Sequence, residues 1–471
     1  MALGKRRREQ QEMWVATPDL PKSPGHVFYR KLNAVLEEAG FDRTLEELCR
    51  PYYADEIGRP GTPPGVYFRM LLVGYFEGIA SQRGIAWRCS DSLSLREFLG
   101  LAPTEPSPDH SSLTRVRDRL PYEVHAAVFQ LVLKMAAEKK LLRGKTVAVD
   151  STTLEANAAM KSIVRRDTGE DWKEYVAGLM REAGLADEEH PPPDEELRRF
   201  DKQRKDKRVP NSEWVSPADP DSRIAKMKDG TTHLAYKAEH VVDLDSDLLL
   251  AAEVYHADQS DSQTLVDSLI DAQTHLTEAG LQPTIEEAAA DKGYHSATAL
   301  AEAEQLAFRT YIPEPELPHQ RTWTDKPEEQ RRAVYNNRRR MARPKGKALQ
   351  RARSELVERS FAHLCETGGG RRTWLRGIEK VRKRWLIQAA ARNLGVILFR
   401  CFGIGTARAL QAGCGLAAAL QLALLLMLRV LVHDNRTIQC QIAVHRSLSS
   451  SLFHNARAGA SVTKTAFSTT C

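Results

Sequence analysis

Paired cysteines are missing from this sequence. No CxxC motif occurs among its seven cysteines, which are Cys49, Cys89, Cys365, Cys401, Cys414, Cys440 and Cys471. The odd number and wide spacing exclude a disulfide framework or a structural zinc site as the scaffold of the chain. We therefore expect reduced thiols and a cytoplasmic protein.

Secretory and membrane-spanning segments are also missing. The opening residues, MALGKRRREQQEMW, contain no apolar core of the kind found in signal peptides. The most apolar stretch covers residues 416–432, but Gln421 and Arg429 interrupt it. The remaining apolar runs are shorter than the roughly 20 residues that a spanning helix needs. We expect a buried or self-associating helix at this position, and no membrane partner.

The chain has little excess of either charge, but its basic residues are clustered. Its 471 residues are 42% hydrophobic, and 68 Lys+Arg against 62 Asp+Glu give a net charge of +6. This length allows a real core and about two to four domains. Basic runs occupy residues 5–8, 198–208 and 331–353, and the last run contains no acidic residue. Such runs suit a nucleic-acid backbone, although each could also be a solvated surface or a charged loop.

We expect a first, helical domain over residues 1–140. Apolar residues at helical spacing follow Pro63 and Pro64, and the cap candidates Asp109 and Ser111 precede a short basic helix that ends before Pro121. Several short helices of this kind fit either a helix-turn-helix unit or an ordinary bundle. In the first case this is a DNA-binding domain, and the basic helix would contact DNA through Arg115, Arg117 and Arg119.

From Lys145 onward, short apolar strands alternate with helices. Two strand-like runs, 232–245 and 248–258, surround a turn at Ser246 and Asp247 and read as a hairpin. A helix follows between the cap candidate Ser260 and the stop signal Gly280, and then the pattern is strand, helix and strand. This order predicts an α/β domain with a mixed sheet and packed helices over residues 141–400.

Two polar insertions and a C-terminal region complete the expected organisation. We expect residues 156–231 to be partly disordered, and residues 314–345 to form a Pro-rich and then basic insertion. Two amphipathic helices should follow, the second with Trp374 on its apolar stripe. Residues 401–471 should contain one more helix and a disordered tail.

Two aspartates share one local pattern. Asp150 ends the apolar run VAVD, and Asp291 ends the run AAAD. If the two strands are neighbours, the carboxylates meet at one end of the sheet, and close carboxylates require a cation between them. Oxygen ligands select Mg²⁺ or Mn²⁺, and two such ions are a standard device for displacement at phosphate. The alternative is that both aspartates only cap turns.

The sequence resembles the DDE transposases of bacterial insertion sequences. The resemblance lies in VAVDSTTLEANA, DKGYHS and ELVERSFAHLCETGGGRRTWLRGIEKVRKRWLIQAAARNLG, and also in PPGVYFRMLLVGYFEGI, SPDHSSLTRVRDRL and ADPDSRIAKMKDGTTHLAYKAEHVVD. It implies an RNase H-like mixed sheet with flanking helices, an N-terminal all-α domain and C-terminal helices. It also implies DNA cleavage and strand transfer at insertion-sequence ends by Asp150, Asp291 and Glu358, which would hold two Mg²⁺ or Mn²⁺ ions.

The glutamate is chosen by the resemblance alone. Helical periodicity places Glu358 roughly opposite the apolar stripe, and Glu355 is the alternative. A related branch carries a Tyr–Arg–Glu–Lys signature on this helix, but here Arg351, Ser354 and Cys365 occupy the other three positions.

The resemblance also implies DNA contacts and partners. The expected contacts outside the first domain are Arg223, Lys226, Lys228, Lys292, Tyr294, Arg353 and Arg359. The expected partners are double-stranded DNA, terminal inverted repeats and target DNA. We expect a homodimer in the DNA complex, because two ends must be held together, in a bacterial cytoplasm at the nucleoid. Two alternatives remain: a metal-dependent nuclease without strand transfer, and a catalytically decayed DNA-binding relic.

Overall fold

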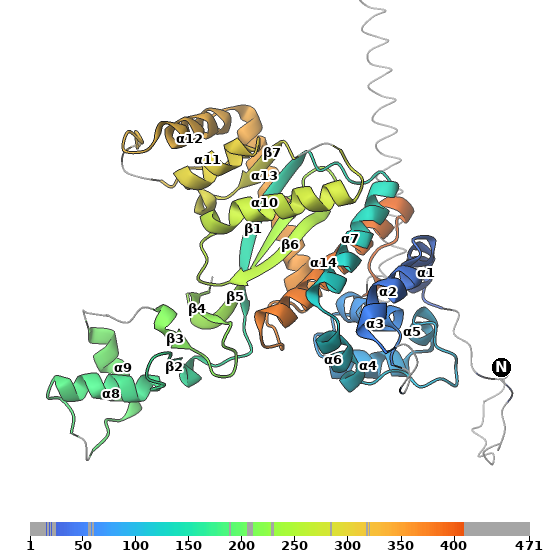
Figure 1. Cartoon of the computed structure of the whole chain (residues 1–471), viewed down its shortest axis with the longest axis horizontal. Helices are drawn as coiled ribbons and strands as arrows, with labels where there is room; N and C mark the ends of the chain where they lie inside the picture. The colour runs from blue at the N-terminus through green and yellow to red at the C-terminus, as the bar shows by residue number, and fades with distance from the viewer. Residues whose placement is uncertain are drawn as a thin grey trace, which may run out of the picture. The chain divides into compact units, whose positions relative to one another are not determined.

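The computed structural model describes residues 16, 18, 20, 25–54, 58, 61–187, 190–204, 211–227, 230–282, 285–316, 319 and 321–408 (Figure 1). The apolar stretch at 416–432, the expected tail, the basic run at 5–8 and Lys228 lie outside these residues. Within the described part, no helix is long and apolar enough to cross a membrane. No disulfide involves Cys49, Cys89, Cys365 or Cys401.

The chain begins with helices, as the periodicity predicts. They are α1 (Val27–Glu38), α2 (Phe41–Cys49), the 3₁₀ turn η2 (Arg50–Tyr52), α3 (Pro64–Glu77), α4 (Gln82–Asp91), α5 (Leu93–Phe98), α6 (His110–Arg119) and α7 (Tyr122–Glu138). The side chains of Ser81, Ser92 and Asp109 accept hydrogen bonds from backbone N–H groups at the starts of α4, α5 and α6. These caps satisfy donors that a helix start leaves unpaired. The predicted cap at Asp109 is therefore confirmed.

A mixed sheet follows the helices. Its strands are β1 (Thr146–Glu155), β4 (Arg223–Lys226), β5 (Thr232–Asp243), β6 (Leu249–His256), β7 (Glu287–Ala290) and β8 (Arg309–Tyr311). The order is β4-β5-β1-β7-β8, with β6 paired to β5. Strands β1, β7 and β8 are parallel, and the remaining pairs are antiparallel. The predicted hairpin is β5–β6, with Asp247 in the left-handed region at φ 61°.

Helices cover both faces of the sheet (Figure 1). They are α10 (Asp261–Glu278), α11 (Ala297–Gln305), α12 (Glu328–Met341), α13 (Pro344–Ala362) and α14 (Ile378–Phe402), with the short turns η5 (Lys292–Tyr294) and η6 (His363–Thr367). Adjacent residues of β5 point to opposite faces of the sheet. Glu239 contacts Thr264 and Ser268 of α10, whereas His240 contacts Ser360 of α13 and Trp385 of α14.

The start of α14 differs from the prediction. Trp374 was expected on its apolar stripe, but this expectation is wrong, because the helix begins at Ile378 and Trp374 is 54% exposed. Gly377 precedes the helix with φ 86°, a conformation that side chains rarely adopt, so the helical pattern cannot continue back through it.

The insertion at 156–231, expected to be partly disordered, is folded where the structure describes it. It contains η3 (Met160–Ser162), β2 (Val164–Arg165), α8 (Trp172–Glu182), α9 (Asp194–Gln203), η4 (Asn211–Glu213) and β3 (Trp214–Val215). Val176, Met180 and Leu197 form a small core of its own between α8 and α9. The polar composition hid these three apolar positions, which are enough to pack two short helices together.

Candidate active site

Asp150 lies inside β1 and not at its end. The strand was expected to stop at this carboxylate, but it continues to Glu155, because residues 147–155 pair with β5 in one unbroken antiparallel register. The Asp150 side chain is 21% exposed. Its Oδ1 accepts a hydrogen bond from the backbone N–H of Ser151 at 2.8 Å. The carboxylate is thus held on the sheet but remains open to solvent.

Asp291 follows the neighbouring parallel strand. Val149 of β1 pairs with Ala290 of β7, so Asp150 and Asp291 stand one step beyond this pair, at corresponding positions of adjacent strands. Asp291 then caps η5, where its Oδ1 accepts a hydrogen bond from the N–H of Gly293 at 2.7 Å. The register brings the two predicted aspartates to one place on the sheet.

A third carboxylate reaches this place from the start of α10. A Cβ atom on Gly293 would lie 2.8 Å from Oδ2 of Asp261 and 3.0 Å from Oδ1 of Asp291. These distances are shorter than ordinary contacts, so the bare glycine leaves a space between the two carboxylates that a methyl group would fill. The sequence interpretation did not include Asp261.

Helix α13 supplies the residues that face Asp150. Nη1 of Arg353 donates to Oδ2 of Asp150 at 2.6 Å. Gln350, one turn earlier, donates to the carbonyl oxygens of Ala290 at 3.0 Å and Tyr311 at 2.6 Å. The side of α13 that faces the sheet therefore runs through Gln350, Arg353 and the buried Val357.

Glu358 is exposed on α13, as its helical periodicity predicts. It follows the buried Val357 by one residue, about 100° around the helix. Its Oε1 accepts a hydrogen bond from Ser354 at 3.0 Å. Glu355 stands about 200° from Val357 and pairs with Arg359 at 2.5 Å. Both glutamates are exposed on this helix.

The donor chemistry of this place suits hard divalent cations, because Asp150, Asp291 and Asp261 offer carboxylate oxygens only. Among the described residues, no three His, Cys, Asp or Glu side chains are already grouped as a metal centre. Arg353 also contacts one oxygen of Asp150. Asp150 and Asp291 offer the oxygen donors that a divalent ion prefers.

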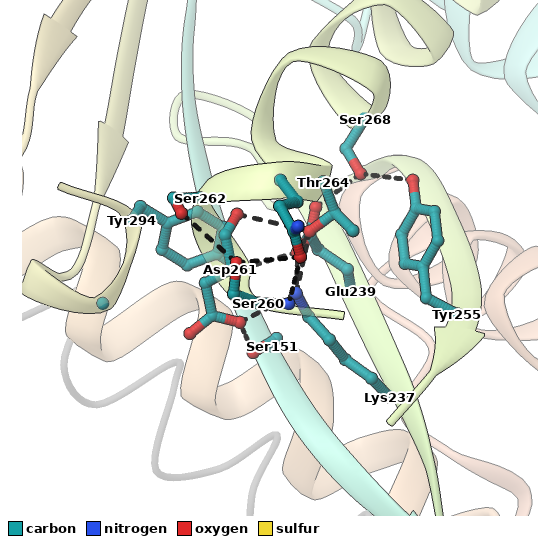
Figure 2. A network of polar contacts seen from close by, with 12 residues as sticks. Ser151, Lys237, Glu239, Tyr255, Ser260, Asp261, Ser262, Thr264, Ser268 and Tyr294 are labelled. Carbon is teal, nitrogen blue, oxygen red and sulfur yellow. Dashed lines mark hydrogen bonds and ion pairs between the residues drawn. The ribbon is translucent and has the colours of Figure 1, made fainter. Parts of the chain in front are cut away.

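A buried polar network lies beneath these carboxylates (Figure 2). Its centre is Glu239 of β5, which is 1% exposed. Glu239 accepts hydrogen bonds from Thr264 at 2.7 Å, Ser268 at 2.5 Å and the hydroxyl of Tyr294 at 2.9 Å. Nζ of Lys237 lies 3.3 Å from the same carboxylate. Burial raises the pKa of Glu239, while Lys237 and the three hydrogen bonds oppose that rise.

The network contacts residues next to both predicted aspartates. Lys237 pairs with Asp261 at 2.9 Å, and the hydroxyl of Ser151 donates to the same Asp261 oxygen at 2.8 Å. Ser151 is the neighbour of Asp150, and Tyr294 ends the turn that Asp291 caps. One signal could have identified this network in the sequence: Lys237 and Glu239 interrupt an apolar strand at alternate positions, on one face.

The expected DNA contacts divide into exposed and buried side chains. Tyr294 is 0% exposed and Arg117 is 8% exposed, so both side chains are buried, whereas a DNA contact at the surface was expected of them. Arg223 donates to the carbonyl oxygens of Pro220 and Ser222. The exposed members of the set are Arg115, Arg119, Lys226, Lys292 and Arg359.

Comparison with known families agrees with this geometry. The family described as Transposase DDE domain matches residues 144–394, which include the sheet, Asp150, Asp291 and α13. The chain belongs to this family. The family described as Transposase domain (DUF772) matches residues 19–119 of the same transposase, which cover helices α1–α6. No curated protein and no solved structure matched the chain.

The match confirms the resemblance and the mixed α/β fold of this transposase. A DDE transposase domain implies polynucleotidyl transferase or nuclease activity, DNA as the substrate and, as is typical of the family, divalent metal ions.

Proposed function

We propose that this transposase cuts DNA at the ends of an insertion sequence and transfers the freed 3′ end to target DNA, with divalent metal ions. The observation that carries the proposal is the parallel register of β1 and β7, which puts Asp150 and Asp291 at corresponding positions of adjacent strands. A turn-capping role alone does not explain Asp150, because the structure places it within a strand.

The residue roles follow from charge and position. Asp150, Asp291 and Glu358 would hold two Mg²⁺ or Mn²⁺ ions. Bound divalent ions supply Lewis-acid stabilisation of the charge that develops when an oxygen nucleophile displaces another at phosphate. Lys292 is exposed beside Asp291 and would attract a DNA phosphate to this edge of the sheet. Arg353 balances the charge of Asp150 when no cation is bound.

Other exposed cations would bind the DNA backbone. Arg115 and Arg119 project from α6, and Lys226 lies on the edge strand β4. We propose terminal inverted repeats as the specific DNA partner and the bacterial nucleoid as the place of action. A homodimer would hold two ends together. Sizing the complex with DNA ends should give an assembly of two chains with two ends, and a complex that stays at one chain with one end would refute the dimer.

The first experiment measures Mg²⁺-dependent cleavage of DNA that carries the element's own ends. We expect the wild type to cut at the end, and Asp150→Ala and Glu358→Ala to lose cutting by a factor of about 100 or more while DNA binding persists. Glu355→Ala is the matched control, since it removes a carboxylate from the exposed surface of the same helix. Normal cutting by Glu358→Ala would show that the third carboxylate is another residue.

Strand joining separates the proposal from its alternatives. Supplied with pre-cut ends and target DNA, a transposase yields a joined product, whereas a nuclease without strand transfer yields none. Wild-type protein that binds the ends but neither cuts nor joins them would indicate a decayed DNA-binding relic.

A further inference from the structure

A second place in the molecule has the properties of a binding site, away from the carboxylates. A cavity of about 480 Å³ lies between helices α3, α4 and α6 on one side and α14 with the preceding loop at 374–375 on the other. Cavities of about 300–1,000 Å³ hold small ligands in proteins. The exposed Trp374, Arg83 and His110 are also part of its lining.

The cavity is lined by positive charge without matching negative charge. Arg117, Lys383 and Arg384 line its interior, and no aspartate or glutamate of the described chain is among its lining residues. Arg117 is 8% exposed and Lys383 is 4% exposed. Buried cations are costly unless they are paired.

The partners of these cations only partly balance them. The carboxylate nearest to Arg117 is Asp118, whose Oδ1 lies 3.9 Å from Nε, which is too far for a hydrogen bond. Lys383 pairs with Glu379 on its own helix at 2.5 Å. Arg384 donates to the carbonyl oxygen of Gly369 at 3.0 Å. Burial, and to a smaller extent the charge of Arg117, lower the pKa of Arg384 to about 10.

Three buried polar atoms of lining residues lack a hydrogen-bond partner in the described structure. They are Nε of Arg117, Nε2 of Gln82 and Oε1 of Gln388. Native proteins rarely leave such atoms unpaired, because each costs free energy. The first two are donors that suit an anion. The third is an acceptor close to the backbone of Gly370. Leu71, Ile79, Ile85 and Ile387 form apolar walls of the cavity.

We propose that this cavity binds a nucleotide, with its phosphate against Arg117 and Arg384 and its base between the apolar walls. A phosphate alone would satisfy the cations but would leave the apolar walls without a partner. The nucleotide can be a free mononucleotide or part of a bound DNA strand. Only the binding of a nucleotide within a DNA strand rests on the proposed function.

The test uses the full chain with inorganic phosphate, with deoxyadenosine monophosphate and with end-sequence DNA, each as a separate arm. Thermal unfolding of the wild type should shift upward by several degrees with the mononucleotide and less with phosphate. Arg384→Met should weaken mononucleotide binding at least tenfold. Without ligand it should unfold no earlier than the wild type, because Arg117 loses a like-charged neighbour. A merely structural arginine would instead lower the unfolding midpoint in every buffer.

Two further variants make the result specific. Lys380→Met removes a cation of α14 that pairs with Asp118 outside the cavity lining, and it should bind the mononucleotide as the wild type does. Arg83→Met lies at an exposed position, so it tests the site without disturbing the core, and it should weaken binding about threefold.

The DNA arm identifies the source of the nucleotide. If only DNA binds, and Arg384→Met reduces the salt dependence of that binding by about one phosphate contact, the ligand is a nucleotide of the strand. If mononucleotide binds although no DNA is cut, the cavity proposal stands and the proposed function falls. If the wild type, Arg384→Met and Arg83→Met bound each of the three ligands with the same affinity, the cavity proposal would be overturned.

Discussion

At the scale of single residues, the contact between Arg353 and Asp150 decides how readily a cation enters the site. The guanidinium lies 2.6 Å from a carboxylate oxygen that a metal ion would need. Arg353→Met should therefore tighten Mn²⁺ binding by about tenfold, the order expected for removing one partly screened positive charge. Titration of Mn²⁺ by calorimetry measures this change. Arg351→Met, an exposed position on the same helix, is the control and should bind Mn²⁺ like the wild type.

Gly293 is a second position where one side chain decides the geometry. A methyl group there would meet oxygens of Asp261 and Asp291 within 3.0 Å. Gly293→Ala should displace the Asp291 carboxylate and, if the proposed role of Asp291 holds, reduce cleavage by about 100-fold, because errors of about 1 Å have such effects on catalysis. Gly178→Ala on α8, where nothing lies within 4 Å of the new atom, should leave cleavage unchanged. Full cleavage by Gly293→Ala would show that Asp291 tolerates this displacement.

At the scale of elements, Glu239 connects β5 to the turn that carries Asp291 (Figure 2). Tyr294→Phe removes the hydroxyl that makes this connection and leaves one bond of a buried carboxylate unmade. We expect a loss of about 1–3 kcal/mol in the free energy of unfolding, together with weaker Mn²⁺ binding. Urea denaturation and Mn²⁺ titration measure the two effects.

Tyr255→Phe provides the matched control for this connection. Its hydroxyl hydrogen-bonds Ser268 in the same network at 3.0 Å but does not contact η5. It should lower stability without changing Mn²⁺ binding. If both variants changed Mn²⁺ binding equally, the network would act on the whole fold and not on the position of Asp291.

The elements also show what the sequence could predict. Alternating apolar residues and cap signals were sufficient for the β5–β6 hairpin and for α10 behind Ser260, because these features are local. They left the adjacency of Asp150 and Asp291 conditional, because it depends on β1 and β7 being neighbours in the sheet although they lie far apart in the chain. The burial of Tyr294 was not predictable in this way. It depends on Glu239, 55 residues away in the chain, whose position on the α10 face is set only by the sheet.

At the scale of the whole molecule, a polar contact joins the N-terminal helices to the sheet. The hydroxyl of Tyr122, the first residue of α7, donates to Glu253 of β6 at 3.0 Å. Burial, with a smaller contribution from Asp271, raises the pKa of Glu253 to about 7. The folded chain therefore holds a proton on this carboxyl at a pH where the unfolded chain has released it.

This difference gives the contact a pH dependence. Because the folded pKa is raised, the stabilisation is present below the unfolded pKa of about 4.5 and is lost as the pH rises to about 7. We expect the free energy of unfolding to fall by about 1–2 kcal/mol from pH 5 to pH 7.5 through this group. Glu253→Gln, which keeps an acceptor for Tyr122, should remove that part of the fall in urea denaturation. Glu123→Gln makes the same charge change at an exposed position of α7 and should retain it. Parallel pH profiles for the wild type and Glu253→Gln would mean that Glu253 is already ionised in the folded protein at pH 5.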